Sequence, residues 1–136
     1  MNDIHTPMSS GELAGMNVLS LAHVGDAVYE LLVRDRLARS GALRVNDQHK
    51  QTISYVSAPA QAAFIQTLLP ELTEAEQAIY RRGRNTRVHG CPSGCSIAQY
   101  HAATGLEVLF GWLWLAGQIG RIQQLFARIA EVHDGT

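Results

Sequence analysis

The sequence predicts a single all-α domain, and three observations favour this fold class. Helix-capping residues followed by apolar residues at helical spacing recur along the chain. No stretch alternates apolar and polar residues like a strand bounded by hairpin turns. The 136 residues, 46% of them hydrophobic, suffice to bury a real core. We expect residues 1–15 to form an N-terminal extension and residues 16–136 to form the domain.

The first long helix has clear boundary signals at each end. Asn17 or Ser20 is suited to cap its N-terminus, because a short polar side chain accepts hydrogen bonds from the first free backbone N–H groups. Gly41 is suited to end it, because glycine readily adopts a left-handed conformation. The next helix is expected to be capped by Asn46-Asp47.

Similar signals divide the rest of the chain. Ser57 starts a third helix with Pro59 in its first turn, and Pro70 stops that helix. The run from Thr73 to Glu76 has the pattern of a capping box, and Ser96 begins a long apolar helix. Helices are therefore expected at residues 17–39, 46–55, 57–69, 73–84, 96–116 and 119–133.

Charge is distributed unevenly, although the net charge is only −1. Residues 34–87 carry nine basic and five acidic side chains, a net charge of +4, whereas the rest carries two basic and seven acidic ones, a net charge of −5. A basic region beside an acidic feature is compatible with binding of a polyanion. Two cysteines without a signal peptide indicate a reducing, cytoplasmic location, and the apolar run at residues 108–120 is too short to span a membrane.

Polar side chains form one stripe along the first long helix, which is otherwise apolar. Ser20, His23, Asp26 and Glu30 are spaced three or four residues apart, and Arg34 continues the series. A buried ionised carboxylate is costly unless it is paired or bound to a cation. The stripe is therefore either a satisfied internal network or one wall of a polar site.

The helix expected at residues 96–116 resembles the first in carrying a carboxylate among apolar residues. Glu107 is flanked by Gly105 and Gly111, and Gly25 precedes Asp26 on the first helix. Glycine inside a helix costs about 1 kcal/mol relative to alanine, and a close approach of two helix backbones would explain its presence. Two facing carboxylates suit Mg²⁺, which binds one or two protein carboxylates together with water and phosphate.

Ordinary ion pairs would explain the same residues without any metal. Asp26 would then pair with His23, Glu30 would pair with Arg34, and Glu107 would meet an arginine from elsewhere in the fold. The pattern alone leaves the metal site and the ion-pair network equally open, because buried carboxylates occur in both.

Two further polar clusters could bind phosphate. The segment 81–87 contains four arginines and an asparagine at a helix end, which suits phosphate but also complements the helix dipole. We favour phosphate binding, because dipole complementarity does not need four arginines. Asn46, His49 and Lys50 form a lesser patch, which is more often a solvated helix face.

The loop that follows contains two cysteines whose role the sequence leaves open. His89, Cys91, Cys95 and His101 invite a zinc site, but the Cys-x₃-Cys spacing is unusual for zinc and no second cysteine pair exists. Nothing pairs either thiol with a particular base, so a thiol nucleophile is not favoured. Free thiols in a loop are the preferred interpretation.

Several of these motifs together resemble the ribonuclease III catalytic domain. The run LAHVGDAVYE resembles its signature helix, whose core is Leu-Gly-Asp-Ala-Val, and ATGLEVLFGWLWL resembles its second acidic helix. Between them, NDQHK, VSAPAQA and RRGRN resemble Mini-ribonuclease III, the short bacterial form without a double-stranded-RNA-binding domain. The resemblance covers residues 18–115, most of the chain, with the motifs in order and at appropriate spacing.

The resemblance implies an all-α endonuclease domain that forms a homodimer and cleaves double-stranded RNA with Mg²⁺. The family's catalytic aspartate falls on Asp26 and its essential glutamate on Glu107, with Glu30 and Thr104 expected in supporting positions. The implied products are 5′-phosphate and 3′-hydroxyl ends, and the implied role is maturation of both ends of precursor 23S ribosomal RNA, with a ribosomal protein as a possible helper. The residues expected to contact RNA are Lys50, Arg82, Arg84, Asn85 and Arg87.

The chain departs from full-length ribonuclease III at two acidic positions. Ala22 and Thr104 stand where those enzymes carry further acids, a difference that the short bacterial branch shares. This weakens the expectation of a complete two-metal cage. Two other functions remain open at this point: a non-catalytic RNA-binding or ribosome-associated module of the same fold, and a helical interaction protein that binds no RNA.

Overall fold

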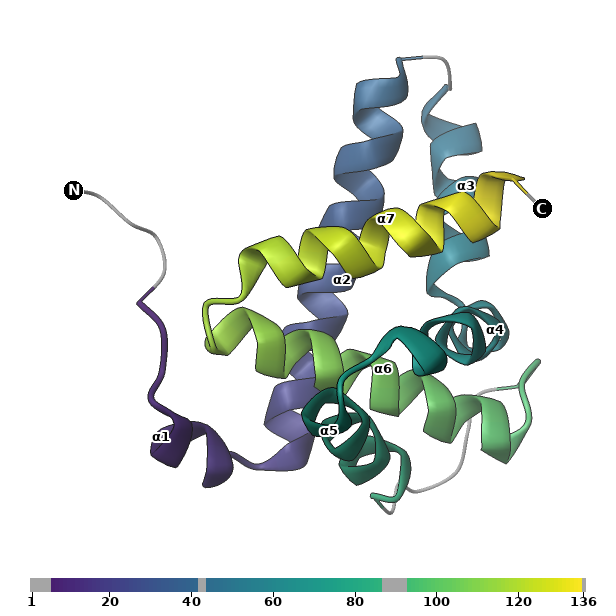
Figure 1. The fold of residues 1–136 in the computed structure, drawn as a ribbon. Coiled ribbons are helices and arrows are strands. Elements are labelled where there is room, and N and C mark those ends of the chain that lie inside the picture. Colours follow the sequence, from purple (N-terminus) through teal and green to yellow (C-terminus); the bar gives the residue numbers. More distant parts are fainter. Residues whose placement is uncertain (1–5, 42–43, 87–92, 136) are drawn as a thin grey trace.

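The structure is a computed structural model that describes residues 6–41, 44–86 and 93–135, and all secondary structure in this part of the chain is helical (Figure 1). The all-α prediction is therefore confirmed. The elements are α1 (Ser10–Ala14), α2 (Val18–Ser40), α3 (Val45–Val56), α4 (Ala58–Leu68), the 3₁₀ turn η1 (Leu69–Glu71), α5 (Glu74–Arg84), α6 (Ile97–Leu115) and α7 (Ile119–Gly135). None of the helices described is long and apolar enough to cross a membrane.

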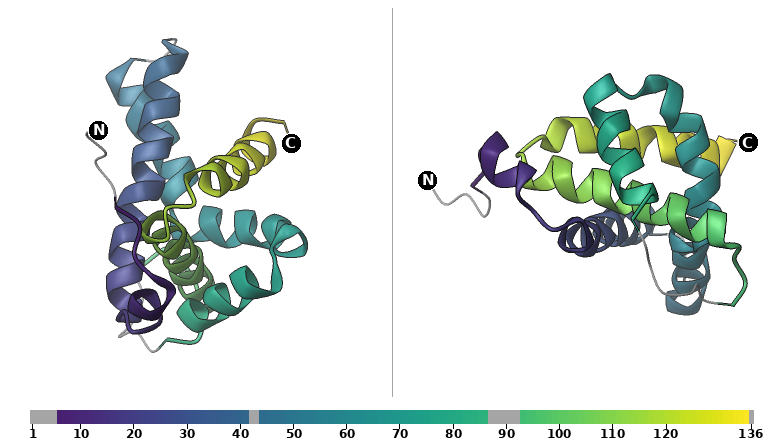
Figure 2. Two further views of the ribbon diagram at one scale, coloured as in Figure 1. Left: turned by 60° about the vertical axis from the view of Figure 1, so that its left-hand side comes forward. Right: turned by 90° about the horizontal axis from the view of Figure 1, so that it is seen from below.

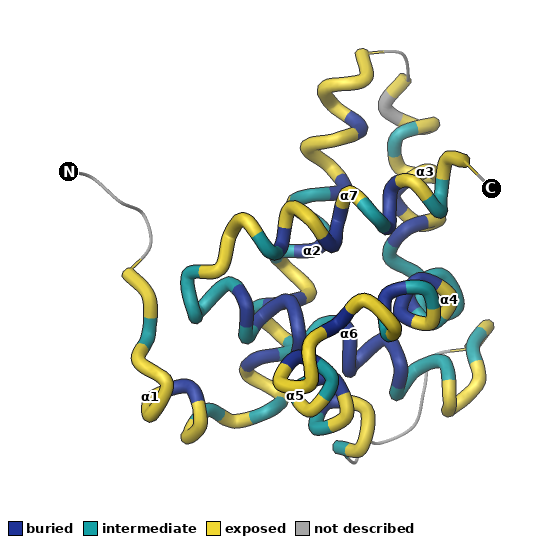
Figure 3. The backbone as a smooth tube through the Cα atoms, in the orientation of Figure 1, coloured by how far each residue is buried: buried dark blue, intermediate teal, exposed yellow. Residues whose placement is uncertain are grey.

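The core is built around α6. This helix packs against α2, α4 and α5, and also contacts α7. Its segment from Ala102 to Leu106 is buried without interruption, as are Val108, Leu109 and Phe110. Figure 3 shows α6 mainly in the colour of buried residues, whereas the surrounding helices are buried on one side. An apolar helix surrounded by amphipathic ones is the arrangement that hydrophobic burial favours.

Helix α2 begins and ends where its boundary residues predict. The Asn17 Oδ1 atom accepts hydrogen bonds from the backbone N–H groups of Leu19 at 2.8 Å and Ser20 at 3.3 Å. Gly41 follows the helix in the left-handed conformation with φ of 65°. The C-terminal part of α2 pairs with α3, and the two project from the bundle as a hairpin (Figure 2).

The caps of the later helices agree with the sequence except at α3. Ser57, Thr73 and Ser96 cap α4, α5 and α6 as predicted, the latter two in capping boxes. The cap predicted at Asn46-Asp47 is wrong, because both residues lie inside the first turn of α3. Arg44 occupies the N-cap position and makes no side-chain capping bond.

The C-terminal end of α7 is attached to the hairpin by polar contacts. Asp134 pairs with Arg36 of α2. The His133 ring stacks on Tyr55 of α3 with 3.8 Å between ring centroids, and its Nε2 atom lies 2.8 Å from the Ser54 hydroxyl. These contacts hold α2, α3 and α7 together at this end of the molecule.

Part of the expected N-terminal extension packs against the bundle. The side chain of Leu13 in α1 is buried, and the Met8 N–H donates to the carbonyl of Leu115 at 2.8 Å. The guanidinium of Arg82 donates to the carbonyl of Met16 at 2.9 Å. These bonds join the segment before α2 to α5 and α6.

Candidate active site

The site is organised by a close crossing of α2 and α6 at two glycines. A Cβ atom added to Gly25 would lie 1.6 Å from the carbonyl oxygen of Glu107, and one added to Gly111 would lie 1.9 Å from the carbonyl oxygen of Leu21. Only hydrogen atoms fit between the two backbones there. The close approach predicted for these glycines is confirmed.

Gly105 serves a different contact from the one that the sequence suggests. A Cβ atom on Gly105 would lie 2.6 Å from the Tyr80 ring of α5, so this glycine admits α5 rather than α2. Gly83 of α5 lies against Gly105 and the Val108 side chain in return. The acidic part of α6 is therefore held between two closely packed neighbours, one on each side.

The α2–α6 crossing brings the carboxylates of Asp26 and Glu107 together. Burial raises the pKa of the Glu107 carboxyl to about 8, and the charge of Asp26 raises it as well. Hydrogen bonding from the Gln61 side chain opposes this rise. Asp26 itself is exposed and lines an open pocket of about 400 Å³ with Glu30 and Arg34. One carboxylate thus faces solvent while its neighbour lies deeper.

The alternative network of ordinary ion pairs is only partly present. Glu30 pairs with Arg34, with 2.9 Å between Oε2 and Nε, as that interpretation expects. Among the residues that the structure describes, neither Asp26 nor Glu107 forms an ion pair, and His23 is exposed. The two central carboxylates thus have no basic partner in the described part of the chain.

Sequence reasoning overlooked Gln61, a buried residue of this site. Its side chain is 2% exposed, its Nε2 donates to the Val56 carbonyl at 2.8 Å, and its Oε1 has no partner among the described residues. A signal exists in the sequence, because Gln61 occupies the first position of the core-facing stripe that continues with Phe64, Ile65 and Leu68. A lone amide at an apolar position is the kind of exception that marks a polar site.

The donor set fits a divalent cation such as Mg²⁺. Asp26 and Glu107 supply carboxylate oxygens, and the unpartnered amide oxygen of Gln61 supplies an acceptor for a bound water. The described residues contain no group of three or more His, Cys, Asp or Glu side chains that could hold a metal. A cation here would therefore keep several waters or use oxygens of a substrate.

The two expected supporting residues have partners within the fold. The hydroxyl of Thr104 is buried and donates to the Tyr100 carbonyl one turn earlier at 3.0 Å. Glu30 is held by Arg34. Both side chains lie on the acidic helices, but the bonds that they make are local ones within their own helices.

The arginine segment lies at the end of α5 that packs beside α6. Arg84 and Asn85 are exposed there, and the Arg84 carbonyl lies 2.9 Å from the His101 Nδ1 atom of α6. Arg82 is half-buried, and its guanidinium donates a hydrogen bond to the Met16 carbonyl. Arg87 lies outside the described residues.

The remaining sequence candidates lie elsewhere. Lys50 and His49 are exposed on α3, a different element from the arginine segment. Cys95 is half-buried, whereas Cys91 and His89 lie outside the described residues. The basic candidates that can be placed therefore belong to the end of α5 and to the surface of α3.

Comparison with known proteins identifies the family of the chain. Residues 19–118 match the family described as the ribonuclease III domain. The Mini-ribonuclease 3 of Symbiobacterium thermophilum is 49% identical over 113 residues, which are 83% of this chain and 87% of that protein. The Mini-ribonuclease 3 of Enterococcus faecalis is 42% identical over 112 residues, which are 81% of this chain and 85% of that protein.

The fold also resembles a solved structure. A crystal structure of a protein from Fusobacterium nucleatum superimposes with a TM-score of 0.77 and 25% sequence identity, covering 82% of this chain and 90% of the other. The family match spans both acidic helices, α2 and α6, apart from the first residue of α2. The chain belongs to the ribonuclease III domain family and is a nuclease of the Mini-ribonuclease 3 type.

Proposed function

We propose that this ribonuclease is a Mg²⁺-dependent endonuclease that cleaves double-stranded RNA, with Asp26 and Glu107 as its catalytic carboxylates. The observation that carries the proposal is their pairing at the glycine crossing of α2 and α6 without a basic partner among the described residues. A fold that brings two like charges together at a cost in free energy is expected to compensate them with a cation.

Each carboxylate has a distinct task in this site. Asp26 is exposed and would offer its oxygens to the RNA side of a bound cation, whereas Glu107 lies deeper and would hold the cation from the inner side. Mg²⁺, when bound, activates water for attack on the phosphodiester and neutralises charge on the phosphate oxygens. The expected products are 5′-phosphate and 3′-hydroxyl ends.

Basic side chains of this domain are the proposed source of RNA affinity. Arg84 and Asn85 at the end of α5, with Lys50 on α3, are exposed and suited to phosphate. A-form RNA is recognised mainly by shape and through phosphate and 2′-hydroxyl contacts, so binding should weaken as salt rises. Arg82 is the weaker candidate because the fold uses its guanidinium.

A homodimer would give each duplex strand its own site. The outward face of α2 leaves the apolar side chains of Leu19 and Leu31 49% and 65% exposed. Leu31 lines the same open pocket as Asp26. A second copy packed there would cover these leucines and bring two sites close together, one for each strand. The proposed substrate, from the family resemblance, is precursor 23S ribosomal RNA at both of its ends.

The decisive experiment incubates the purified protein with a structured double-stranded RNA, first with Mg²⁺ and then with EDTA. The wild type should cut only with Mg²⁺. Asp26→Asn and Glu107→Gln should retain the far-ultraviolet circular dichroism of the fold and lose cleavage by at least about a thousandfold. Wild-type rates from both variants would contradict the assignment.

The same assay separates the other functions. Binding to RNA without cleavage under any metal condition would identify a non-catalytic RNA-binding module. Neither binding nor cleavage would identify a helical interaction protein. The presence of both carboxylates, Asp26 and Glu107, favours the enzyme over either alternative.

A further inference from the structure

The amide of Gln61 has a fixed orientation in the fold. Its Nε2 donates to the carbonyl of Val56, the last residue of α3, at 2.8 Å. A carbonyl oxygen only accepts hydrogen bonds, so the atom that faces it must be the amide nitrogen. The orientation therefore does not depend on an arbitrary assignment of oxygen and nitrogen.

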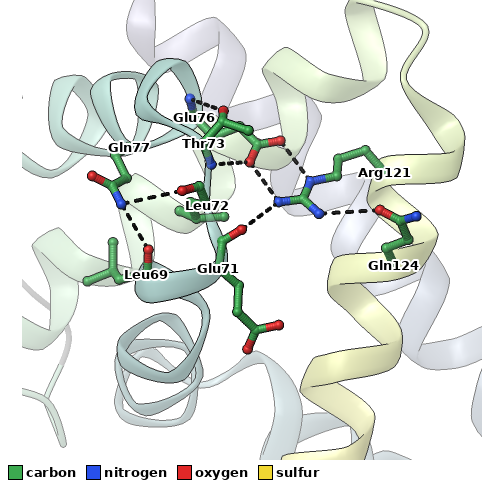
Figure 4. Close-up of polar contacts among 8 residues, drawn as sticks. All are labelled: Leu69, Glu71, Leu72, Thr73, Glu76, Gln77, Arg121 and Gln124. Carbon is green, nitrogen blue, oxygen red and sulfur yellow. Dashed lines mark hydrogen bonds and ion pairs between the residues drawn. The ribbon is translucent and has the colours of Figure 1, made fainter.

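Anchoring α3 to α4 does not account for the whole amide. The Gln61 Oε1 atom is buried without a partner among the described residues, which costs free energy that an apolar side chain would avoid. Gln77 makes a similar anchor without this cost: its Nε2 donates to the carbonyls of Leu69 at 3.0 Å and Leu72 at 3.4 Å (Figure 4). Gln77 is half-buried, and its oxygen is not left buried and unpaired.

The Gln61 amide also reaches the candidate active site. The Gln61 side chain lies within hydrogen-bonding reach of the Glu107 carboxylate. The amide nitrogen has two hydrogens, one directed to Val56 and one available for Glu107. Standard bond lengths place an amide oxygen roughly 2.2 Å from its nitrogen, so Oε1 lies next to the atom that can meet Glu107.

We propose that Gln61 is a positioning residue of the metal site: its N–H orients the Glu107 carboxylate, and its Oε1 accepts a hydrogen bond from a water held by the cation. Mg²⁺ keeps several of its waters when bound to proteins, and each such water is a hydrogen-bond donor. Partners of this kind orient the ligands of a metal and tune its affinity. The inference rests on the proposed metal-dependent function of Asp26 and Glu107.

The test compares Gln61→Met with the matched variant Gln77→Met. Each replaces a glutamine that anchors a helix-end carbonyl by an unbranched apolar side chain of similar size. Both should lower the melting temperature by a few degrees. Mn²⁺ binding, followed by the loss of the free-ion electron paramagnetic resonance signal, should weaken about 10- to 100-fold in Gln61→Met and stay unchanged in Gln77→Met.

RNA cleavage supplies a second readout. The Mg²⁺ concentration for half-maximal cleavage should rise by a similar factor in Gln61→Met, and excess Mg²⁺ should restore most of the rate. If Gln61→Met does not fold, Gln61→Asn draws the amide back by one methylene and should weaken Mn²⁺ binding in the same direction. Wild-type Mn²⁺ affinity in the folded variant would overturn the role of Gln61.

Failure of the proposed function would look different. If the wild type binds no Mn²⁺, there is no metal site at these carboxylates. The same conclusion follows if the wild type and the Asp26→Asn variant bind Mn²⁺ with equal affinity. A wild type that binds Mn²⁺ through Asp26, together with an unaffected Gln61→Met, would leave the metal site in place and remove only Gln61 from it.

Discussion

Glu76 and Glu107 are both glutamates on helices packed against the core, yet the fold treats them in opposite ways. Glu76 accepts hydrogen bonds at 2.8 Å from Nε and Nη2 of Arg121 and at 2.9 Å from the backbone N–H of Thr73 (Figure 4). Pairing with Arg121 holds the pKa of Glu76 below its usual value. Glu107 has a second carboxylate as its neighbour, and its pKa is raised to about 8.

The difference separates a structural carboxylate from a functional one. The bonds of Glu76 are used within the protein, where they join α5 to α7. Glu107 has no basic partner among the described residues, so a cation from solution can bind to it. In an otherwise apolar core, the carboxylate without a cation is therefore the one expected to act in catalysis.

The largest expected effect comes from Gly25→Ala, which would disrupt the α2–α6 crossing that places Glu107 beside Asp26. The new Cβ would lie 1.6 Å from the Glu107 carbonyl oxygen and 2.8 Å from the Gly111 nitrogen. The clashing atoms belong to the α6 backbone, which cannot move away without disrupting the helix. The free energy of unfolding should therefore fall by at least about 3 kcal/mol, the upper end of the typical cost of overpacking a core. Urea denaturation measures the change.

Gly120→Ala is the matched control, because nothing lies within 4 Å of a Cβ at that helical position. It should be neutral or stabilise the protein by up to about 1 kcal/mol, since alanine restricts the unfolded chain more than glycine does. Equal stability of the Gly25 and Gly120 variants would show that α2 and α6 are not in backbone contact.

A second prediction compares Glu76→Gln with Glu107→Gln in metal-free buffer, where they should change stability in opposite directions. Glu76→Gln removes the charge that faces Arg121 and should lower the free energy of unfolding by about 2 kcal/mol at pH 7. Glu107→Gln removes a carboxylate that is costly to ionise, so it should raise stability above pH 8.

The pH dependence follows from the raised pKa of Glu107. The folded protein holds this proton more tightly than the unfolded chain, so wild-type stability from this group is greatest below pH 4.5 and is lost as the pH rises to about 8. The difference between Glu107→Gln and wild type should therefore grow across this window. Denaturation at pH 4, 6 and 9 measures it, and a constant difference would contradict the burial of Glu107.

Local signals in the sequence were sufficient for most of the fold. Asn17, Gly41 and Thr73 act through neighbours within a few residues, so their caps are visible in the sequence itself. The cap of α3 differs from the prediction because a capping residue works only at the N-cap position, and Asn46 is the second residue of the helix, two positions after the N-cap Arg44.

Long-range contacts explain the other misses. The sequence shows Glu76 as part of a capping box, but its pairing with Arg121, 45 residues away, leaves no local pattern. Likewise, Gly105 was assigned to the α2 contact although it faces Tyr80 of α5. The glycines on both helices predict their close approach, but the pattern alone leaves open whether Asp26 and Glu107 face each other or form ion pairs. The resemblance to the ribonuclease III domain is what favours the first interpretation.

The smallest expected effects concern two neighbouring arginines, which repeat the contrast between a group used by the fold and one available to a ligand. Arg82 donates to the Met16 carbonyl at 2.9 Å, whereas Arg84 is exposed, with its guanidinium 5.7 Å from the centre of the Tyr80 ring. Arg82→Ala should lower the free energy of unfolding by about 1 kcal/mol. Arg84→Ala should leave stability nearly unchanged and weaken RNA binding several-fold.

Salt dependence distinguishes a phosphate contact from an indirect effect. Removing one phosphate-binding side chain should reduce the slope of log affinity against log salt concentration by about 1, because one fewer counterion is released. A gel-shift series with catalytically inactive Asp26→Asn, with and without Arg84→Ala, measures this slope while the RNA stays intact. An unchanged slope in the double variant would remove Arg84 from the RNA-binding surface. The same series with Arg82→Ala in place of Arg84→Ala tests the neighbouring arginine. A reduced slope there would assign the phosphate contact to Arg82.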